Sequence, residues 1–159
     1  MFIDKVKIHI KAGKGGNGCI AFRREKGVPR GGPSGGNGGN GGSVIAQAVE
    51  HLNTLVDQYF TQHYTAKNGV HGQGKNMHGA VGDDAIIRVP PGTIITDSET
   101  GETIADLTTE GQTVVLVEGG RGGRGNARFK SSTNQAPRVA EKGEPGEEKY
   151  VNLELRLIA

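Results

Sequence analysis

The sequence predicts a mainly-β protein in which a small antiparallel β-barrel carries a projecting, glycine-rich bundle. Short runs rich in Val, Ile and Thr favour strands. Only one short stretch has helical spacing, so no long crossover helices are available to build parallel βαβ units. Glycine accounts for 28 of the 159 residues. Apolar residues make up 33% of the chain, enough for one modest core, and we therefore expect a single domain over residues 1–159.

The first predicted strand opens the chain, where Val6, Ile8 and Ile10 alternate with polar residues. A period of two is typical of a strand with one buried face. Further runs rich in Val, Ile and Thr lie at 44–49, 85–89, 93–96, 113–117 and 151–158. The runs TIIT and ETIADL are separated by turn-forming residues at 97–101, which predicts a hairpin.

The single helical pattern consists of Leu52, Leu55, Val56 and Tyr59, which is enough for one short helix. Together these elements place the barrel at about 1–12, 44–66, 83–118 and 148–159. The glycine-rich projections then occupy about 13–43, 67–82 and 119–147.

Glycine recurs every third residue in the projections. Gly35, Gly38 and Gly41 form one such row, and Gly119 and Gly122 belong to another. Because a polyproline II helix has three residues per turn, each row lies along one face and lets neighbouring helices approach backbone to backbone. We therefore predict an ordered bundle of left-handed polyproline II helices. A set of flexible glycine-rich linkers is the alternative.

Basic charge is concentrated in the same stretches. Residues 13–42, 63–82 and 119–138 carry formal charges of +4, +2 and +5, whereas the remainder carries −9 and the whole chain only +2. Basic projections on an acidic barrel are typical of a surface that binds a polyanion. The alternative interpretation is a solvated charged face.

The basic clusters contain the candidate RNA contacts. Guanidinium groups bind phosphate in a bidentate manner and stack on unpaired bases. Phe22 and Phe129 lie beside two of the clusters and supply rings for stacking. The predicted RNA-binding residues are Arg23, Arg24, Lys26, Arg30, Lys75, His78, Arg121, Arg124, Arg128 and Lys130.

Enzyme motifs are present only in part. Residues 13–18 satisfy GxGxxG after a strand, but the helix and the later acidic residue of a dinucleotide site do not follow. Gly69, Gly74 and Lys75 have the spacing of a phosphate-binding P-loop, yet Asn76 stands where Mg²⁺ ligation needs Ser or Thr. We therefore predict no catalytic residue and no nucleotide cofactor within this chain.

Metal ligation and redox chemistry are also disfavoured. His63, His71 and His78 lack the Cys, Asp or Glu that would complete a metal site, and phosphate or base contact suits loop histidines better. The lone Cys19 has no partner for a disulfide. With neither a leader pattern nor an apolar run of about 18 residues, the chain is expected to be cytoplasmic and to have no membrane partner.

Four strings occur in an informative order: FRREKGVPRGGPSGGNGGNGG, HGQGKNMHG, VPPGTIITDSETGETIADLTTEGQ and EGGRGGRGNARFKSSTNQAPR. They resemble the N-terminal domain of the Obg family of GTPases, over essentially the whole chain. The resemblance implies the Obg fold, in which glycine-rich loops form left-handed polyproline-type helices on a small β-barrel. It also implies a role in late assembly of the large ribosomal subunit, with the loop tips contacting ribosomal RNA near the A-site in a tRNA-like manner.

In that family GTP and Mg²⁺ are handled by a separate domain, which begins just after a strand like LELRLIA. We expect such a domain after residue 159 of a longer protein. The expected partners of this chain are the large ribosomal subunit and its RNA, and not DNA. The competing hypothesis is a protein-interaction scaffold that docks stress or regulatory partners, whose apolar interface would respond little to salt.

The chain departs from the family pattern at some positions. Asn37 and Asn40 stand where the family often has Asp, which removes negative charge from the first projection. Between Asn68 and Asp83 the side chains match less closely. In that stretch Gly79 is the position where a larger side chain is expected to distort the tip without removing a contact.

Overall fold

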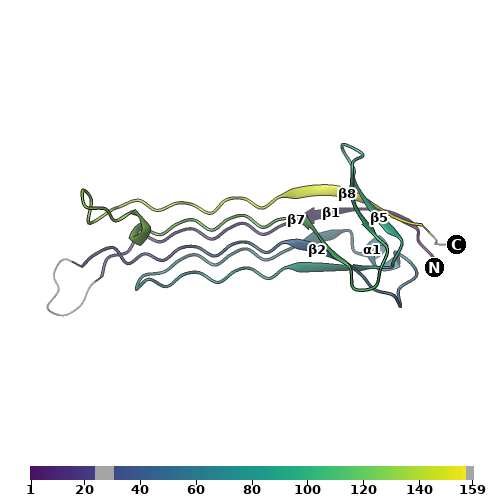
Figure 1. The fold of residues 1–159 in the computed structure, drawn as a ribbon, viewed down its shortest axis with the longest axis horizontal. Helices are drawn as coiled ribbons and strands as arrows, with labels where there is room; N and C mark the ends of the chain where they lie inside the picture. Colours follow the sequence, from purple (N-terminus) through teal and green to yellow (C-terminus); the bar gives the residue numbers. More distant parts are fainter. Residues whose placement is uncertain (24–30, 157–159) are drawn as a thin grey trace.

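The computed structural model describes residues 1–23 and 31–156, which form a β-sheet base and one long, narrow projection (Figure 1). The elements in chain order are β1 (Lys5–Lys11), β2 (Val44–Ala48), α1 (Val56–Phe60), β3 (His63–Thr65), β4 (Ala85–Val89), β5 (Thr93–Asp97), β6 (Thr103–Leu107), β7 (Thr113–Val117), the 3₁₀ helix η1 (Asn126–Phe129) and β8 (Glu148–Leu155). The mainly-β class is therefore confirmed. No helix among the described residues has the length and apolar character needed to cross a membrane.

The strands of the base form two sheets around one core. The larger sheet has the order β3-β1-β8-β5-β6 and the smaller one β4-β2-β7. Alternation places the core, because β1 buries Val6, Ile8 and Ile10 and exposes its three lysines. Ile87 and Leu153 are likewise buried, from β4 and β8. Burial of these side chains supplies the main hydrophobic stabilisation of the base.

Two strand pairs are parallel, although the sequence predicted an antiparallel barrel. β1 pairs with β3 and β2 pairs with β4 in parallel, whereas the remaining ladders are antiparallel. Parallel pairing needs a long connection, which is usually a helix. Here the chain leaves the base after β1 and β3 and returns to it before β2 and β4 (Figure 1). The glycine-rich excursions thus replace the crossover helices that the sequence lacks.

The projection consists of extended segments that hydrogen-bond to each other at every third residue. The segments are 12–21, 31–43, 66–74, 77–84, 118–125 and 138–147. Gly13 N–H donates to the Gly42 carbonyl at 2.8 Å, and Gly16 N–H donates to the Gly39 carbonyl at 2.8 Å. Gly18 N–H, on the same segment, donates to a different neighbour, Glu141, at 2.9 Å. One segment therefore donates hydrogen bonds to two different neighbouring segments. Such regular pairing is expected of an ordered bundle and not of flexible linkers.

Glycine is needed in the projection because the backbones touch. A Cβ added to Gly38 would lie 1.9 Å from the Gly16 carbonyl oxygen, and one added to Gly122 would lie 1.9 Å from that of Gly38. The corresponding distances at Gly35, Gly41, Gly79 and Gly119 are 1.8, 1.9, 1.8 and 1.8 Å, each to a backbone carbonyl oxygen. Among the described glycines, only three in the base have positive φ. The projection therefore uses glycine for its lack of a side chain and not for its conformational freedom.

Asn and His side chains accept the N–H groups that backbone carbonyls do not reach. The amide oxygens of Asn37 and Asn40 accept from Gly125 N–H and Gly122 N–H, both at 2.9 Å. The Nδ1 atom of His71 accepts from the Asn17 N–H at 2.8 Å, and that of His78 accepts from the Asn37 N–H at 2.9 Å. These side chains therefore stabilise the bundle from within, since an unpaired backbone donor is costly.

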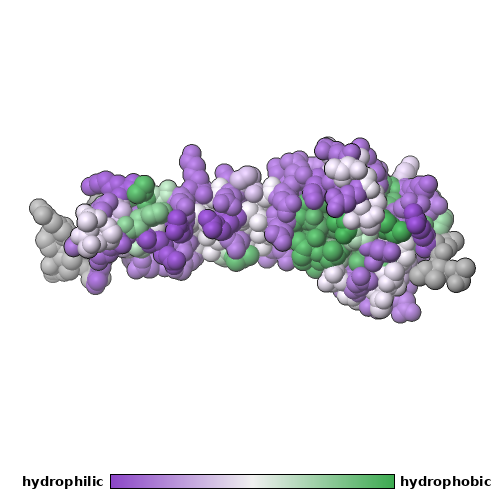
Figure 2. Space-filling model, turned by 45° about the horizontal axis from the view of Figure 1, so that its top comes forward, coloured by the Kyte–Doolittle hydropathy of each residue, from purple (hydrophilic) through white to green (hydrophobic). Residues whose placement is uncertain are grey.

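Apolar surface is concentrated on the base. The space-filling view shows its largest green area beside the start of the projection, while the projection is mostly purple or white (Figure 2). On the outer face of the smaller sheet, Ile45 of β2 is in register with Ile86 of β4 and Val115 of β7. Ile86 and Val115 are 46% and 48% exposed. The projection therefore owes its order to hydrogen bonds and close backbone packing more than to buried side chains.

Replacing Gly38 by Ala is expected to destabilise the projection by about 3 kcal/mol, the upper range for overpacking, because the Gly16 carbonyl occupies the space of the new Cβ. Gly32→Ala is the matched control: Gly32 belongs to the same row, and only Lys130 Nζ, at 3.8 Å, approaches its Cβ position. Hydrogen exchange of the projection amides measures both effects. Equal protection in the two variants would contradict the packing.

The histidine contacts predict a tautomer. An imidazole that accepts at Nδ1 and is neutral carries its proton on Nε2. Imidazole ¹⁵N shifts of His71 and His78, recorded at about pH 8 where histidine is ordinarily neutral, are expected to report the Nε2–H form. His51 is the control, because its exposed side chain makes no hydrogen bond with any described residue that would fix one tautomer. An Nδ1–H signal from His71 or His78 would refute the assignment.

Candidate nucleic-acid interface

The connections at the end of the projection are held together by one buried side chain, Asn126. Its amide oxygen accepts from the Gly35 N–H at 2.8 Å, and its Nδ2 donates to the carbonyls of Ala21 at 3.0 Å and Pro137 at 3.1 Å. Asn126 is fully buried, so these bonds offset the cost of burying its amide. Sequence reasoning missed this residue, whose only signal was the end of the glycine repeat at Gly125.

A tight turn presents Lys75 at the end of the projection. Lys75 and Asn76 both have left-handed backbones, with φ of 61° and 55°. The Asn76 N–H donates to the Ser34 carbonyl at 2.7 Å, which fixes the turn against the neighbouring segment. Lys75 itself is exposed. The turn therefore fixes the backbone from which the Lys75 side chain extends into solvent.

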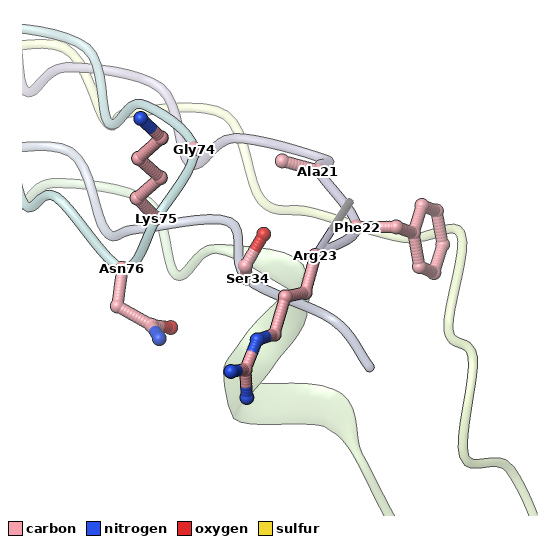
Figure 3. Close-up of a pocket in the computed structure, with 7 residues that line it drawn as sticks. All are labelled: Ala21, Phe22, Arg23, Ser34, Gly74, Lys75 and Asn76. Atoms are coloured by element: carbon pink, nitrogen blue, oxygen red, sulfur yellow. The ribbon is translucent and has the colours of Figure 1, made fainter. Parts of the chain in front are cut away.

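A surface depression of about 460 Å³ lies beside this turn (Figure 3). It is lined by Ala21, Phe22, Arg23, Ser34, Gly74, Lys75 and Asn76. In the close-up, the side chains of Phe22 and Lys75 point away from each other, and the Arg23 guanidinium extends toward a third side. Two cations and an aromatic ring therefore border the depression and extend in different directions.

Arg128 and Lys130 lie on or next to η1, at the same end of the projection. Both side chains are exposed, and neither makes an ion pair with a described residue. Arg138 lies nearby, with its guanidinium carbon 5.6 Å from the centre of the Phe22 ring. Such uncompensated cations attract anions from solution.

The predicted contact Arg124 is engaged within the projection. Its Nε and Nη2 donate to the two carboxylate oxygens of Glu141 at 2.7 and 3.2 Å, and its guanidinium lies 5.0 Å from the Phe129 ring centre. The hydrogen bond from the Arg124 side chain, followed by that from its backbone N–H, lowers the pKa of Glu141 to about 2. The same pair raises the pKa of Arg124. Arg121 pairs more loosely with Glu144, at 3.8 Å.

The predicted site residues thus separate into distinct groups. Arg23, Lys75, Arg128 and Lys130 lie at the end of the projection, whereas Arg121 and Arg124 lie along its shaft. His78 uses its Nδ1 atom inside the bundle and retains Nε2 for other contacts. Arg24, Lys26 and Arg30 lie outside the described residues.

The motifs that resemble nucleotide sites lie in the projection. Residues 13–18 belong to a straight extended segment, and Gly74 and Lys75 belong to the terminal turn. The segment that follows that turn is extended, with no helix. Within residues 1–23 and 31–156, no three His, Cys, Asp or Glu side chains are grouped to hold a metal ion.

Comparison with known proteins places the chain in a family. A family model described as GTP1/OBG matches residues 3–157. The GTPase Obg of Persephonella marina is 63% identical over 158 residues, which cover 99% of this chain and 46% of that protein. The GTPase Obg of Desulfitobacterium hafniense is 61% identical over 159 residues, covering 100% of this chain and 38% of that protein.

The chain spans less than half the length of these curated relatives. The similarity nevertheless extends over its base and its projection alike, because the matched residues 3–157 include all the strands and glycine-rich segments that the structure describes. The resemblance seen in the sequence is confirmed, and the chain belongs to the GTP1/OBG family.

Proposed function

We propose that this chain is an RNA-binding module whose projection contacts ribosomal RNA of the large subunit during late assembly of that subunit. The observation that carries the proposal is the placement of Lys75, Arg128 and Lys130, which are exposed and without ion-pair partners among the described residues. All three lie at the end of an ordered projection. Positive charges without acidic partners, placed at the end of a narrow projection, are suited to bind a polyanion that lies in a recess.

Aromatic rings at the same end favour RNA over a simple anion. Phe22 and Phe129 each lie beside an arginine, at 5.6 and 5.0 Å from ring centre to guanidinium carbon. Unpaired bases of RNA loops stack on such rings and on guanidinium planes. Because the described segments are already hydrogen-bonded to one another, they lose little further conformational freedom on binding.

We further infer that the segments are polyproline II helices, because their hydrogen bonds recur with a period of three residues.

GTP hydrolysis is assigned in this proposal to another part of the protein. The relatives are named GTPase Obg, and the matched region is 46% and 38% of their length. We propose that GTP and Mg²⁺ bind to a part of the protein outside the matched region, and that the present chain supplies the contact with the ribosome. The proposed compartment is the cytoplasm. The competing proposal, a scaffold for stress or regulatory proteins, differs in its response to salt.

The proposal is tested by co-sedimentation of the chain with purified large ribosomal subunits across a salt series. The double variant Arg128→Ala/Lys130→Ala is expected to lower the slope of log affinity against log salt by about 1.4–1.8, the loss of two phosphate contacts. The charge control is Arg88→Ala, which removes a positive charge from the base and is expected to leave the slope unchanged.

Binding with an unchanged slope in the tip variant would overturn the proposed contact. Binding of the parent chain that does not depend on salt would favour the protein scaffold instead. Circular dichroism of both variants, compared with the parent chain, verifies that the fold is retained.

A further inference from the structure

The outer face of the five-stranded sheet, which belongs to the base and not to the tips, carries a row of aromatic rings. His9 of β1 is in register with His63 of β3 on one side and with Tyr150 of β8 on the other. The ring centres are 5.5 Å apart for His9 and His63 and 4.8 Å apart for His9 and Tyr150. His63 is exposed and Tyr150 is 47% exposed. The row therefore offers the faces or edges of its outer rings to solvent.

A stripe of lysines runs along β1 beside these rings. Lys5, Lys7 and Lys11 are all exposed, and none makes an ion pair with a described residue. Lys7 Nζ lies 5.2 Å from the centre of the Tyr150 ring. Alternate residues of a strand are about 6.6 Å apart, a repeat comparable to that of successive phosphates in an extended nucleic-acid strand. The stripe thus places positive charge along a line instead of at one point.

The two acidic residues of β8 that flank the lysines, Glu148 and Glu154, have other partners. Asp97 and Glu99 line a separate depression beside Tyr150, together with Lys149. Glu148 Oε1 lies 2.6 Å from His9 Nε2, and Glu154 Oε1 lies 3.8 Å from Arg156 Nε. Although Lys5 is in register with Glu154 and Lys11 with Glu148, neither cross-strand pair forms an ion pair. The lysine charge therefore remains available to a ligand.

Shallow depressions accompany the stripe. One, of about 310 Å³, is lined by Lys7, Ile8, His9, Gln62, His63 and Tyr150. Another, of about 440 Å³, shares Lys7 and continues toward Lys5 and Asn152. A planar ring placed in the first depression would contact Tyr150 and His63, with its attached phosphate next to Lys7.

We propose that this sheet face is a second RNA-binding surface, which takes a single-stranded segment with its bases against Tyr150 and His63 and its phosphates along the β1 lysines. Single strands are commonly bound by a sheet whose aromatic residues stack bases and whose basic residues track the backbone. An acidic protein segment would engage the lysines but would gain little from a row of rings. This surface is separate from the tips and stands independently of the function proposed for them.

The test uses a fluorescein-labelled twelve-nucleotide oligouridylate and fluorescence anisotropy on the full chain. All measurements are made with the tip variant Arg128→Ala/Lys130→Ala as background, so that failure of the tip proposal and failure of this one are distinguishable. In that background Tyr150→Ala is expected to weaken binding about 5- to 150-fold, the effect of losing one base–ring stack. Lys7→Ala is expected to lower the salt slope by about 0.7.

Two controls separate stacking from folding. Tyr59→Ala removes a ring of nearly equal exposure, 46% against 47%, from α1 and is expected to leave affinity unchanged. Tyr150→Phe retains the stacking ring and is expected to bind like the background chain. Loss of all oligouridylate binding in the tip variant alone would overturn the proposal, as would equal binding by the Tyr150→Ala chain. Equal competition by polyglutamate would show a surface that recognises charge alone and would also overturn it.

Discussion

Direct contact between backbones is the constraint on which this structure depends. In the projection a neighbouring carbonyl oxygen occupies the space where a side chain would begin, as at Gly122, whose Cβ position is 1.9 Å from the Gly38 oxygen. The same closeness brings N–H and carbonyl groups into hydrogen-bond distance at every third residue. Since the large buried apolar side chains lie in the base, backbone hydrogen bonds carry the order of the projection. A long structure without an apolar core of its own therefore requires the glycine repeat.

The same constraint determines how the base is built and what the projection presents. Each segment that leaves the base must return antiparallel to a neighbour, and this arrangement pairs β1 with β3 and β2 with β4 in parallel without a crossover helix. Along the shaft, side chains of one segment face those of the next, so Arg124 meets Glu141 and its charge is compensated. At the end of the projection Arg128 and Lys130 make no ion pair with a described residue, and the same holds for Lys14 and Lys67 along the shaft. Geometry, more than composition, therefore decides which basic residues are available to RNA.

Local patterns predicted much of the fold. The alternation of Val6, Ile8 and Ile10 identified β1, and the three-residue glycine period identified the bundle. The strand β3 has only three residues, too few for an alternating pattern to predict it as a separate strand. The roles of Asn126 and His78 depend on groups 91 and 41 residues away in the chain, so no local spacing announces them. The pairing of Arg124 with Glu141 likewise joins two segments that are distant in sequence.

Backbone ¹⁵N relaxation of the free chain tests the central claim most directly, because it reports whether the projection is ordered before any partner binds. Close packing predicts order parameters of about 0.85 for amides along the shaft, such as those of Gly16, Gly39 and Gly123, equal to those of the base strands. Values below about 0.6 along the shaft, with a rigid base, would contradict the account and would describe the segments as flexible linkers that become ordered only on binding.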